Sequence, residues 1–415
     1  TEIKKIKEGV KKNIKIINPF HLLSLIDDPK LHKQAAIIYT KKNGLHIVNN
    51  EIKKSNKRKI KLGYFSADFK NHAVLHLMMD VFKNHNKSHF EVVGFNHGKK
   101  TDDMTKVVKK YFDKFFDCSN LSDKEIANLS QKNNIDIAIN LTGHTIDSRE
   151  GIYQYKPAKI NVNYLGYPGT MGSNCYNYII ADRVILPKNE TKNFTENVIY
   201  LPECYQPNQQ RSHEIDNNQT KKSLGLPDKK FIFGSFNNSY KITPVIFKSW
   251  MEILEKTKDS VLWLLQNNEH AKKNIIKETK KCGIDIKRII FAHRVSSQEH
   301  IKRLKFIDLF LDTHPYNAHT TAKEAVRMGV PVVTIMGKSF ASRVASSILK
   351  SIELDKLITK TIEDYTDLSI KLGNNKEKLN KIKDHLNSPK IIEKIHDCKK
   401  FTEDLEDVYK KMINY

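Results

Sequence analysis

The chain has 415 residues, and its 71 lysines and arginines exceed its 47 acidic residues, which gives a formal net charge of +24. Hydrophobic residues make up 39% of the chain and aromatic residues 9%, which is enough for packed cores and excludes a wholly disordered protein. No apolar run approaches the length of a bilayer span and no signal peptide opens the sequence, so we expect no membrane segment.

The first predicted element is a helical and mostly polar segment at 1–57, with an apolar-rich stretch at 17–43. No 34-residue repeat of the tetratricopeptide kind is visible in it. The sequence opens TEIKKIKEGV without a methionine, so we expect it to be part of a longer protein.

Strands and helices are predicted to alternate from residue 58 onward. Short β-branched runs predict strands, whereas 3.6-residue apolar periods with Ser, Thr or Asp starts predict helices at 101–116 and 122–133. This alternation predicts a parallel sheet with helices on both faces. The predicted strands are 59–69, 90–96, 135–143, 160–167 and 178–182.

A polar stretch at 204–222 interrupts the pattern, and a second alternating series follows it. We therefore predict four parts: a helical segment at 1–57, Rossmann-like domains at 58–222 and 223–390, and a C-terminal helix at 391–415. Because open α/β sheets bind ligands at the carboxyl ends of their strands, two such sheets facing each other would form an interdomain cleft. The predicted strands of the second series are 231–237, 260–266, 288–293, 306–312 and 331–337.

One candidate site is the junction HPYNAHTTAKEA at 314–325, where an apolar strand ends and a helix begins. The first amides of a helix are unpaired and carry partial positive charge, which suits a phosphate. His319, Thr320 and Thr321 could add donors, and Glu324 could hold ribose hydroxyls one turn later. An ordinary helix cap with a favourably placed glutamate is the alternative.

A second candidate is Lys241 in FNNSYKITP, where another strand passes into a helix whose first turn suits Pro244. Its ammonium could contact a departing diphosphate, although one more surface lysine among many is the simpler interpretation.

Two histidines follow strands in the first alternating series. His72 lies at a turn after a strand, with His76 four residues later, and His144 in LTGHT lies at another strand end. No carboxylate or cysteine completes a metal-ligand set with them, so a role for His72 as acid, base or orienting group is favoured over a metal site. A helix-capping or core histidine is the alternative.

The stretch LGYPGTMG at 165–172 is a Gly/Pro-rich turn that would let backbone approach a ligand closely. Such turns are common, and by itself this one is a weak signal.

The five cysteines lie far apart without a C-x-x-C pair, which argues against a zinc site or disulfides and favours a cytoplasmic location. The excess of lysine could indicate a nucleic-acid-binding protein. The lysines are spread along the whole chain, however, and no motif concentrates them, which favours a solvated basic surface.

Taken together, the segments resemble the catalytic region of the O-linked N-acetylglucosamine transferases and their Spindly-type relatives, glycosyltransferase family 41. The resemblance covers roughly 58–415 in the family's order. It is carried by GYFSADFKNH, LTGHT, YLGYPGTMG, YIIAD, SFNNSYKITP, SVLWLL, RIIF, QEHIKR, LDTHPYNAHTTAKEA, GVPVVT and SFASRVASSIL.

The resemblance implies a GT-B architecture and an inverting transferase that needs no metal and no cofactor besides its donor substrate. It assigns Lys241 to the donor diphosphate and His72 to the acceptor side as a catalytic histidine. The residues that it implies for nucleotide-sugar binding are Asn238, His300, Arg303, His319, Thr320, Thr321 and Glu324, together with His144 and the turn residues Gly166, Pro168, Gly169 and Thr170.

The chain departs from the family at two positions. Ser297 stands where a relative has a lysine beside the base, and Asn133 lies near an aspartate that has been proposed as the base. One base contact and the identity of the general base are therefore open, with His72, water and the donor phosphate as the alternatives.

We expect transfer of N-acetylglucosamine from UDP-N-acetylglucosamine to Ser or Thr hydroxyls of a protein acceptor. GDP-fucose is the alternative donor, because LTGHT and FNNSYKITP look equally similar to plant Spindly proteins. Two other classes compete: a nucleic-acid-binding protein on a borrowed fold, and an inactive interaction platform, which the presence of Lys241 and His319 disfavours.

Overall fold

The structure is a computed structural model that describes residues 2–48, 59–210 and 219–414. The end of the predicted helical segment, at 49–57, and the middle of the predicted linker, at 211–218, lie outside the described residues. The chain divides into two compact units: unit 1 comprises Thr1–Gln210 and Asp397–Tyr415, and unit 2 comprises Arg211–His396.

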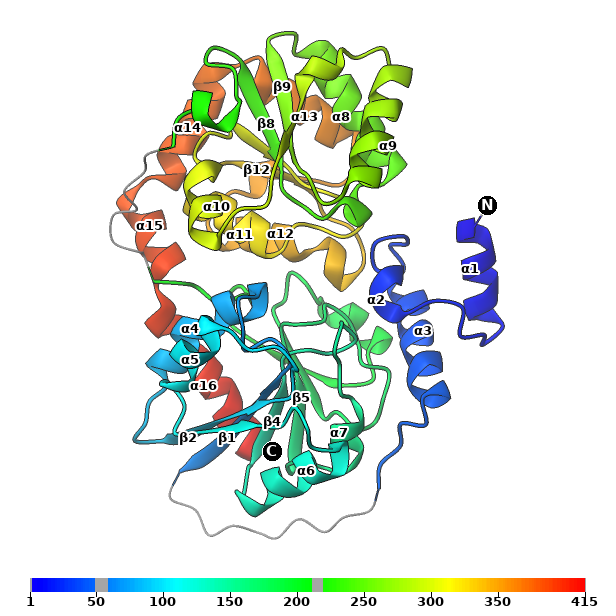
Figure 1. The fold of residues 1–415 in the computed structure, drawn as a ribbon, viewed down its shortest axis with the longest axis vertical. Helices are drawn as coiled ribbons and strands as arrows, with labels where there is room; N and C mark the ends of the chain where they lie inside the picture. The colour runs from blue at the N-terminus through cyan, green and yellow to red at the C-terminus, as the bar shows by residue number, and fades with distance from the viewer. Residues whose placement is uncertain (1, 49–58, 211–218, 415) are drawn as a thin grey trace. The chain divides into compact units, whose positions relative to one another are not determined.

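Unit 1 contains a seven-stranded sheet of order β3-β2-β1-β4-β5-β6-β7, and its described strand pairs are all parallel (Figure 1). Strands β4 and β5 are buried along their whole length, as expected for a sheet that helices cover on both faces. The strands are β1 (Ile60–Ser66), β2 (Phe90–Asn96), β3 (Lys114–Asp117), β4 (Ile137–Asn140), β5 (Ile160–Asn163), β6 (Tyr178–Ala181) and β7 (Asn197–Tyr200). The helices that accompany this sheet are α4 (Ala73–Asn84), α5 (Asp103–Lys109), α6 (Asp123–Lys132), α7 (Gly151–Gln154) and α16 (Cys398–Asn414), with the 3-10 helix η1 (Lys188–Asn193).

Unit 2 contains a six-stranded parallel sheet of order β10-β9-β8-β11-β12-β13. Its strands are β8 (Phe231–Ser235), β9 (Ser260–Leu265), β10 (Ile289–Ala292), β11 (Leu309–Leu311), β12 (Val332–Ile335) and β13 (Ile358–Thr359). Its helices are α8 (Pro244–Lys256), α9 (Glu269–Lys281), α10 (Ser297–Leu304), α11 (Thr320–Arg327), α12 (Val344–Ser351), α13 (Ile362–Gly373), α14 (Lys376–Leu386) and α15 (Pro389–His396). Its 3-10 helices are η2 (Lys222–Leu224), η3 (Ser239–Lys241), η4 (Ile286–Arg288), η5 (Phe340–Ser342) and η6 (Asp355–Leu357).

The strand order of unit 2 determines which face of the sheet each helix covers. The chain steps from β8 to β10 in one direction and from β11 to β13 in the other, so right-handed crossovers put the two sets of helices on opposite faces. Helices α10, α11 and α12 accordingly pack in a row (Figure 1), whereas α8 packs against α13. The predicted fold class, two doubly wound parallel α/β sheets, is confirmed.

Three strands were not predicted from the sequence. The predicted helix at 101–116 is wrong in its second half, because α5 ends at Lys109 and Lys114–Asp117 forms the edge strand β3. Strands β7 and β13 were also missed; both are edge strands, and β13 has only two residues. An edge strand is paired on one side only, so its sequence carries a weaker pattern than a buried central strand.

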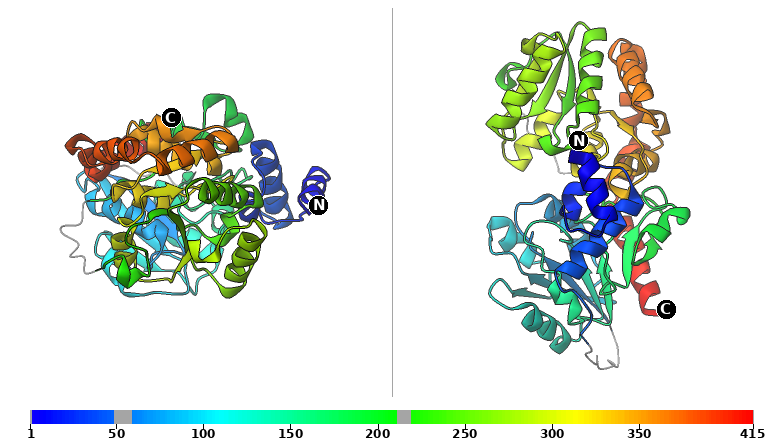
Figure 2. Two further views of the ribbon diagram at one scale, coloured as in Figure 1. Left: turned by 90° about the horizontal axis from the view of Figure 1, so that it is seen from above. Right: turned by 90° about the vertical axis from the view of Figure 1, so that its right-hand side faces the viewer.

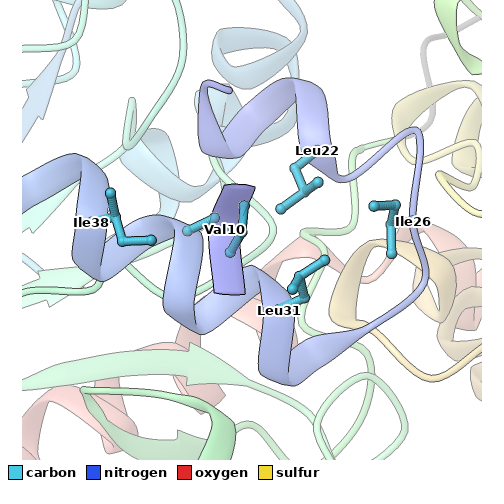
Figure 3. Close-up of a cluster of buried hydrophobic side chains, with 6 residues drawn as sticks. Val10, Leu22, Ile26, Leu31 and Ile38 are labelled. Carbon is cyan, nitrogen blue, oxygen red and sulfur yellow. The ribbon is translucent and has the colours of Figure 1, made fainter. Parts of the chain in front are cut away.

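The N-terminal helices form a small apolar cluster of their own. Helices α1 (Glu2–Lys11), α2 (Pro19–Leu22) and α3 (Pro29–Lys42) meet there, and the prolines of α2 and α3 occupy first turns that Asn18 and Asp28 cap. The buried residues of the cluster are Val10, Leu22, Ile26, Leu31, Ala35 and Ile38 (Figure 3).

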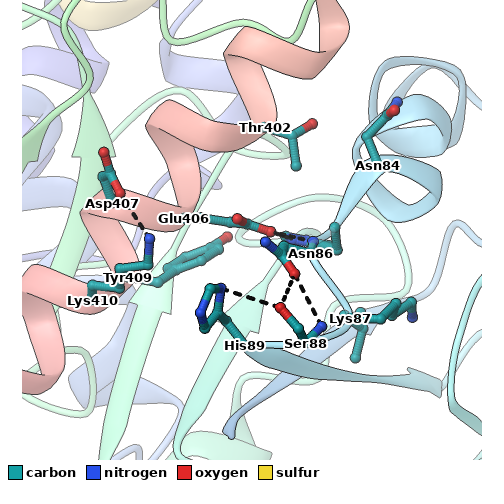
Figure 4. A network of polar contacts seen from close by, with 12 residues as sticks. Asn84, Asn86, Lys87, Ser88, His89, Thr402, Glu406, Asp407, Tyr409 and Lys410 are labelled. Atoms are coloured by element: carbon teal, nitrogen blue, oxygen red, sulfur yellow. Dashed lines mark hydrogen bonds and ion pairs between the residues drawn. The ribbon is translucent and has the colours of Figure 1, made fainter.

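The last helix, α16, returns to unit 1 at the C-terminus (Figure 2). There it packs against α4 (Figure 1). Glu406 on α16 accepts a hydrogen bond from the His85 ring at 2.9 Å. It also accepts one from the Asn86 backbone at 2.7 Å (Figure 4). The Tyr409 hydroxyl lies 3.1 Å from that of Tyr64 on the central strand β1. Among the described residues, no helix combines the length and the apolar character that crossing a membrane requires.

Candidate functional site

The strand order of unit 2 reverses between β8 and β11, which are hydrogen-bonded neighbours. At such a reversal the connections leave the sheet in opposite directions and open a crevice at the carboxyl ends of the strands, where ligands of α/β proteins bind. The two segments that follow these strands, 236–243 and 312–321, overlap the stretches 236–244 and 314–325 that sequence reasoning singled out. The topology brings both to the same edge of the sheet.

Lys241 ends the 3-10 turn that follows β8 and is 8% exposed. Its Nζ donates a hydrogen bond to the Asn317 carbonyl at 2.8 Å and lies 3.8 Å from the centre of the Tyr316 ring. Burial lowers the pKa of Lys241 to about 7, and the negative charge of Asp312 opposes that shift. Lys241 is therefore a buried lysine whose Nζ interacts with the other segment of the site.

His319 is the residue before α11, and no side chain caps this helix. The His319 Nε2 lies 3.2 Å from the Ala341 carbonyl, so this nitrogen carries a proton and donates it there. Burial lowers the pKa of His319 well below its usual value, and the nearby Lys241 lowers it further, so the ring is neutral. The uncapped first turn of α11 leaves its backbone amides available to an anion.

The two threonines lie in the first turn of α11 rather than before it, so they are not its caps. Thr321 donates its hydroxyl to the Asn237 side-chain oxygen at 3.1 Å, which ties α11 to the segment after β8. The Asn237 side chain is 3% exposed and its Nδ2 has no hydrogen-bond partner, whereas Asn238 is exposed. Sequence reasoning named Asn238 and missed Asn237.

A chain of polar contacts links α10 to α11. Arg303 donates to the His300 Nδ1 from Nε at 3.2 Å and from a terminal nitrogen at 3.0 Å, so the proton of the neutral ring is on Nε2. That Nε2 lies 3.5 Å from a carboxylate oxygen of Glu324. The Arg303 guanidinium also lies 4.6 Å from the Phe236 ring centre, and burial lowers its pKa to about 10. The structure thus brings together the three residues that the resemblance assigns around the nucleoside.

The corresponding reversal in unit 1 lies between β1 and β4. His72 is the N-cap of α4, where its Nδ1 accepts the Val74 amide at 3.3 Å and lies 3.6 Å from an Asp68 carboxylate oxygen. The lone pair that caps the helix must be on Nδ1, so the neutral ring carries its proton on Nε2. The half-exposed His72 therefore presents a donor at its free nitrogen.

His144, in contrast, is 1% exposed, and both of its nitrogens have partners inside the protein. Nδ1 lies 2.5 Å from a Glu150 carboxylate oxygen and Nε2 lies 2.9 Å from the Met171 carbonyl. These contacts give His144 a role in holding the turn at 165–172. A direct contact with a nucleotide-sugar stays a prediction.

The turn at 165–172 is packed closely around its glycines. A Cβ on Gly166 would collide with the Leu141 carbonyl, and one on Gly169 would lie 3.0 Å from the Tyr167 ring. Pro168 is buried, and the Thr170 hydroxyl donates to Glu196 at 2.5 Å. The turn is thus a fixed piece of backbone beside the carboxyl edge of the sheet. In the described parts of the chain, no three His, Cys, Asp or Glu side chains lie close enough together to hold a metal ion.

Comparison with known proteins agrees with this geometry. The profile of Glycosyl transferase family 41 matches residues 31–214 and 208–405. The chain is 32% identical over 419 residues to Arabidopsis thaliana SEC, and 28% identical over 367 residues to Solanum lycopersicum SPINDLY, both described as probable UDP-N-acetylglucosamine–peptide N-acetylglucosaminyltransferases. These matches cover 96% and 86% of this chain but only 43% and 39% of the two relatives.

Solved structures share the fold. A mutant O-GlcNAc transferase of Thermobaculum terrenum superposes with a TM-score of 0.87 at 24% identity, over 99% of this chain and 81% of that one. Anabaena HepE in complex with UDP superposes with a TM-score of 0.58 at 11% identity, over 85% of this chain and 100% of that one. At these identities the likeness shows a GT-B-like fold.

Proposed function

Because the chain belongs to glycosyl transferase family 41, we propose that it transfers N-acetylglucosamine from UDP-N-acetylglucosamine to serine or threonine hydroxyls of protein acceptors. The transfer inverts the anomeric carbon and uses no metal ion. The names of the SEC and SPINDLY relatives support both the donor and the peptide acceptor, and the UDP complex of HepE supports the nucleotide.

The observation that carries the proposal is the pairing of Lys241 with the uncapped start of α11 at the strand-order reversal of unit 2. A lysine is costly to bury, and a helix end without a cap leaves donors unsatisfied. A diphosphate would satisfy both, because it supplies negative charge to the ammonium and acceptor oxygens to the amides of Thr320 and Thr321.

In the proposed reaction the acceptor oxygen attacks the anomeric carbon from the face opposite the diphosphate. The bond from that carbon to the phosphate oxygen breaks, and its electron pair leaves with the uridine diphosphate. Negative charge therefore grows on the diphosphate in the transition state, where Lys241 and the helix amides stabilise it. Lys241 and the helix amides thus supply the positive charge that a divalent cation would otherwise supply.

His72 is better suited to orienting an oxygen than to removing a proton. Its Nδ1 is engaged in capping α4, and its free Nε2 carries the ring proton. The proton of the acceptor hydroxyl then passes to a water molecule or to a phosphate oxygen of the donor, while His72 donates a hydrogen bond to a substrate oxygen.

The nucleoside end of the donor is assigned to α10 and α11. Arg303 holds His300, and His300 in turn faces Glu324, so the imidazole and the carboxylate are held in fixed positions. The carboxylate accepts hydrogen bonds from ribose hydroxyls, and the ring nitrogen can donate to the sugar or the base.

Donor binding tests the proposal directly. We expect UDP and UDP-N-acetylglucosamine to raise the melting temperature of the protein more than GDP and GDP-fucose do, because a ligand that binds only the folded state stabilises it. Transfer is then measured by intact-mass analysis of peptides with serine or threonine after incubation with each nucleotide-sugar, with and without EDTA.

A mass gain of one N-acetylhexosamine that persists in EDTA supports the proposal. Preference for GDP and transfer of a deoxyhexose would assign the chain to the fucosyl branch instead. No stabilisation by either nucleotide, together with binding to random duplex DNA that weakens steeply with salt, would overturn it in favour of nucleic-acid binding.

A further inference from the structure

A buried carboxylate, that of Asp312, lies near enough to Lys241 for the two charges to interact. Asp312 follows β11 directly and is 1% exposed. An ionised carboxylate is rarely buried unless hydrogen bonds or an opposite charge stabilise it. The roles proposed above for the site do not use Asp312.

The carboxylate closes the loop at 313–318 through three hydrogen bonds. Oδ1 accepts the backbone amides of Thr313 at 2.7 Å and Ala318 at 2.5 Å, and Oδ2 accepts the Thr334 hydroxyl at 2.6 Å. The first two bonds join the two ends of the loop, and the third fastens it to the neighbouring strand β12.

This loop carries the groups that surround the Lys241 ammonium. The Asn317 carbonyl accepts its hydrogen bond, and the Tyr316 ring lies against it. Within the loop, the Thr313 hydroxyl donates to the Tyr316 carbonyl at 2.7 Å, and the Asn317 side-chain amide donates to the Thr313 carbonyl at 3.0 Å. Asp312 therefore holds the 313–318 loop in place, and this loop in turn positions the Lys241 ammonium.

The two charges also act on each other through space. Burial lowers the pKa of Lys241, and Asp312 opposes this; burial raises the pKa of Asp312, and Lys241 opposes that together with the three hydrogen bonds. In such a pair the two protons leave in two separate steps, and the ionic form exists between them. With Asp312 ionised, Lys241 keeps its proton to a higher pH than it would alone.

We propose that Asp312 is a positioning residue for the transfer reaction, which holds the 313–318 loop around Lys241 and keeps the lysine cationic so that it binds the donor diphosphate. The inference rests on the proposed function, because it concerns how that function depends on pH. In this role Asp312 does not contact the donor. It determines whether Lys241, which does contact the donor, is charged.

The substitution Asp312→Asn separates the charge from the hydrogen bonds. Its amide oxygen still accepts the two backbone amides, and its amide nitrogen can face the Thr334 hydroxyl. Asp308→Asn is the matched control, because Asp308 lies just before the same strand, at its other end, and bonds to the Ile232 amide and to Lys383. Both variants are compared with the wild-type chain for UDP affinity by calorimetry and for kcat/KM.

These measurements are made between about pH 5.5 and 9, because kcat/KM reports the ionisation of groups in the free enzyme. Only the cationic lysine binds the diphosphate, so affinity and kcat/KM fall as pH rises through the pKa of Lys241. Loss of the neighbouring negative charge lowers that pKa, so in Asp312→Asn the fall occurs about one pH unit or more lower. UDP binding should then be about tenfold weaker at the alkaline end and close to wild type at the acidic end.

An unshifted pH profile in Asp312→Asn, or a loss equal at every pH, would overturn the inference, because a purely structural role predicts one or the other. Asp308→Asn should keep the wild-type profile. If the wild-type chain binds no UDP at any pH, both the proposed function and the inference are wrong. If the wild type binds UDP and only the shift is missing, the inference alone fails.

Should Asp312→Asn not fold, the pair is tested by stability. Lys241→Met is introduced with and without Asp312→Asn, and urea unfolding is measured for each chain. Folding restored by Lys241→Met supports the inference, because the unpaired ammonium was then the cause of unfolding. Failure of Lys241→Met to restore folding shows that Asp312 contributes hydrogen bonds alone and overturns the inference.

Discussion

At the scale of single residues, the site of unit 2 depends on a lysine that has been taken out of water. A lysine in solvent keeps its charge far above neutral pH. Burial brings the pKa of Lys241 down to about 7, so its charge near neutral pH depends on its neighbours and on the ligand. Such a group serves binding rather than stability, because the folded protein bears a desolvation cost that a diphosphate offsets.

Lys241→Met is therefore expected to reduce kcat for transfer by about 10²–10³-fold, the effect typical of removing one donor that stabilises a developing negative charge. Its melting temperature should change little, because methionine has no desolvation cost on burial whereas Asp312 loses a nearby positive charge. Lys248→Met is the control, since Lys248 is exposed on α8, the helix that follows Lys241, and it should leave both quantities unaltered. Wild-type turnover in Lys241→Met would remove the lysine from the mechanism.

The residues of this site could be predicted from the sequence only in part. Lys241 and the 319–321 turn stand out because each lies where a strand passes into a helix, and the family resemblance names them. Asp312 and Asn237 carry no such signal, since each looks like an ordinary polar residue at the end of a strand. Their importance comes from partners that are distant in the sequence, such as Thr321, which lies 84 positions after Asn237, or from burial, and a single sequence shows neither.

At the scale of elements, helix α3 supports the Gly/Pro-rich turn of unit 1. The Thr40 hydroxyl donates to the Gly172 carbonyl at 2.8 Å, and the Tyr39 ring packs edge-on against His144, whose Nε2 bonds to Met171. Gly172 has a φ of +65°, and a Cβ there would collide with the backbone of Ala36. The N-terminal helices are thus part of what shapes this turn.

Gly172→Ala should be markedly more damaging than Gly225→Ala. Both glycines adopt the left-handed backbone conformation, so alanine at either position should cost about 1–2 kcal/mol of stability. Gly225, however, has open space around it. The collision with α3 should add about 1–3 kcal/mol at Gly172 and displace the turn. Urea unfolding measures the first effect, and the KM for peptide acceptors measures the second. Equal losses in the two variants would show that α3 does not constrain the turn.

Sequence patterns predicted most elements but placed some of them wrongly. Central strands such as β8 and β9 were predicted because their runs are continuously apolar. Strand β3 was assigned to the helix before it, because KFFD continues the apolar spacing of α5 and only pairing with β2 makes it extended. Periodicity describes the exposure of a segment and not its partners, and the three strands that it missed, β3, β7 and β13, all lie at sheet edges.

At the scale of the whole molecule, the chain leaves unit 1 for unit 2 and returns with α16. The sequence predicted a C-terminal helix but not which unit it would join, because an amphipathic helix can pack on either. Two sets of contacts attach α16 to unit 1. Side chains of α16 such as Leu405 and Tyr409 are buried, and a polar network around His85 joins the helix to the rest of the unit.

That network makes the attachment of α16 sensitive to acid. The neutral His85 ring donates from Nδ1 to Glu406 and accepts the Tyr64 hydroxyl at Nε2, at 2.9 Å each. Burial lowers the pKa of His85 although Glu406 opposes the shift, so the unfolded chain binds a proton there more readily than the folded one. Stability is therefore present above the unfolded pKa of about 6.5 and is lost as pH falls below it, by up to about 1.4 kcal/mol per pH unit.

His85→Gln isolates this contribution, because glutamine can donate to Glu406 and accept from Tyr64 but does not titrate. Other buried histidines, His32 and His97, have lowered pKa values too and will weaken both proteins in acid, so the difference between the chains is what counts. Between pH 6.5 and 5.5 we expect the wild type to lose about 1 kcal/mol more unfolding free energy than His85→Gln, measured by urea denaturation. Parallel losses would mean that His85 becomes protonated in place and that α16 is held by its apolar side chains alone.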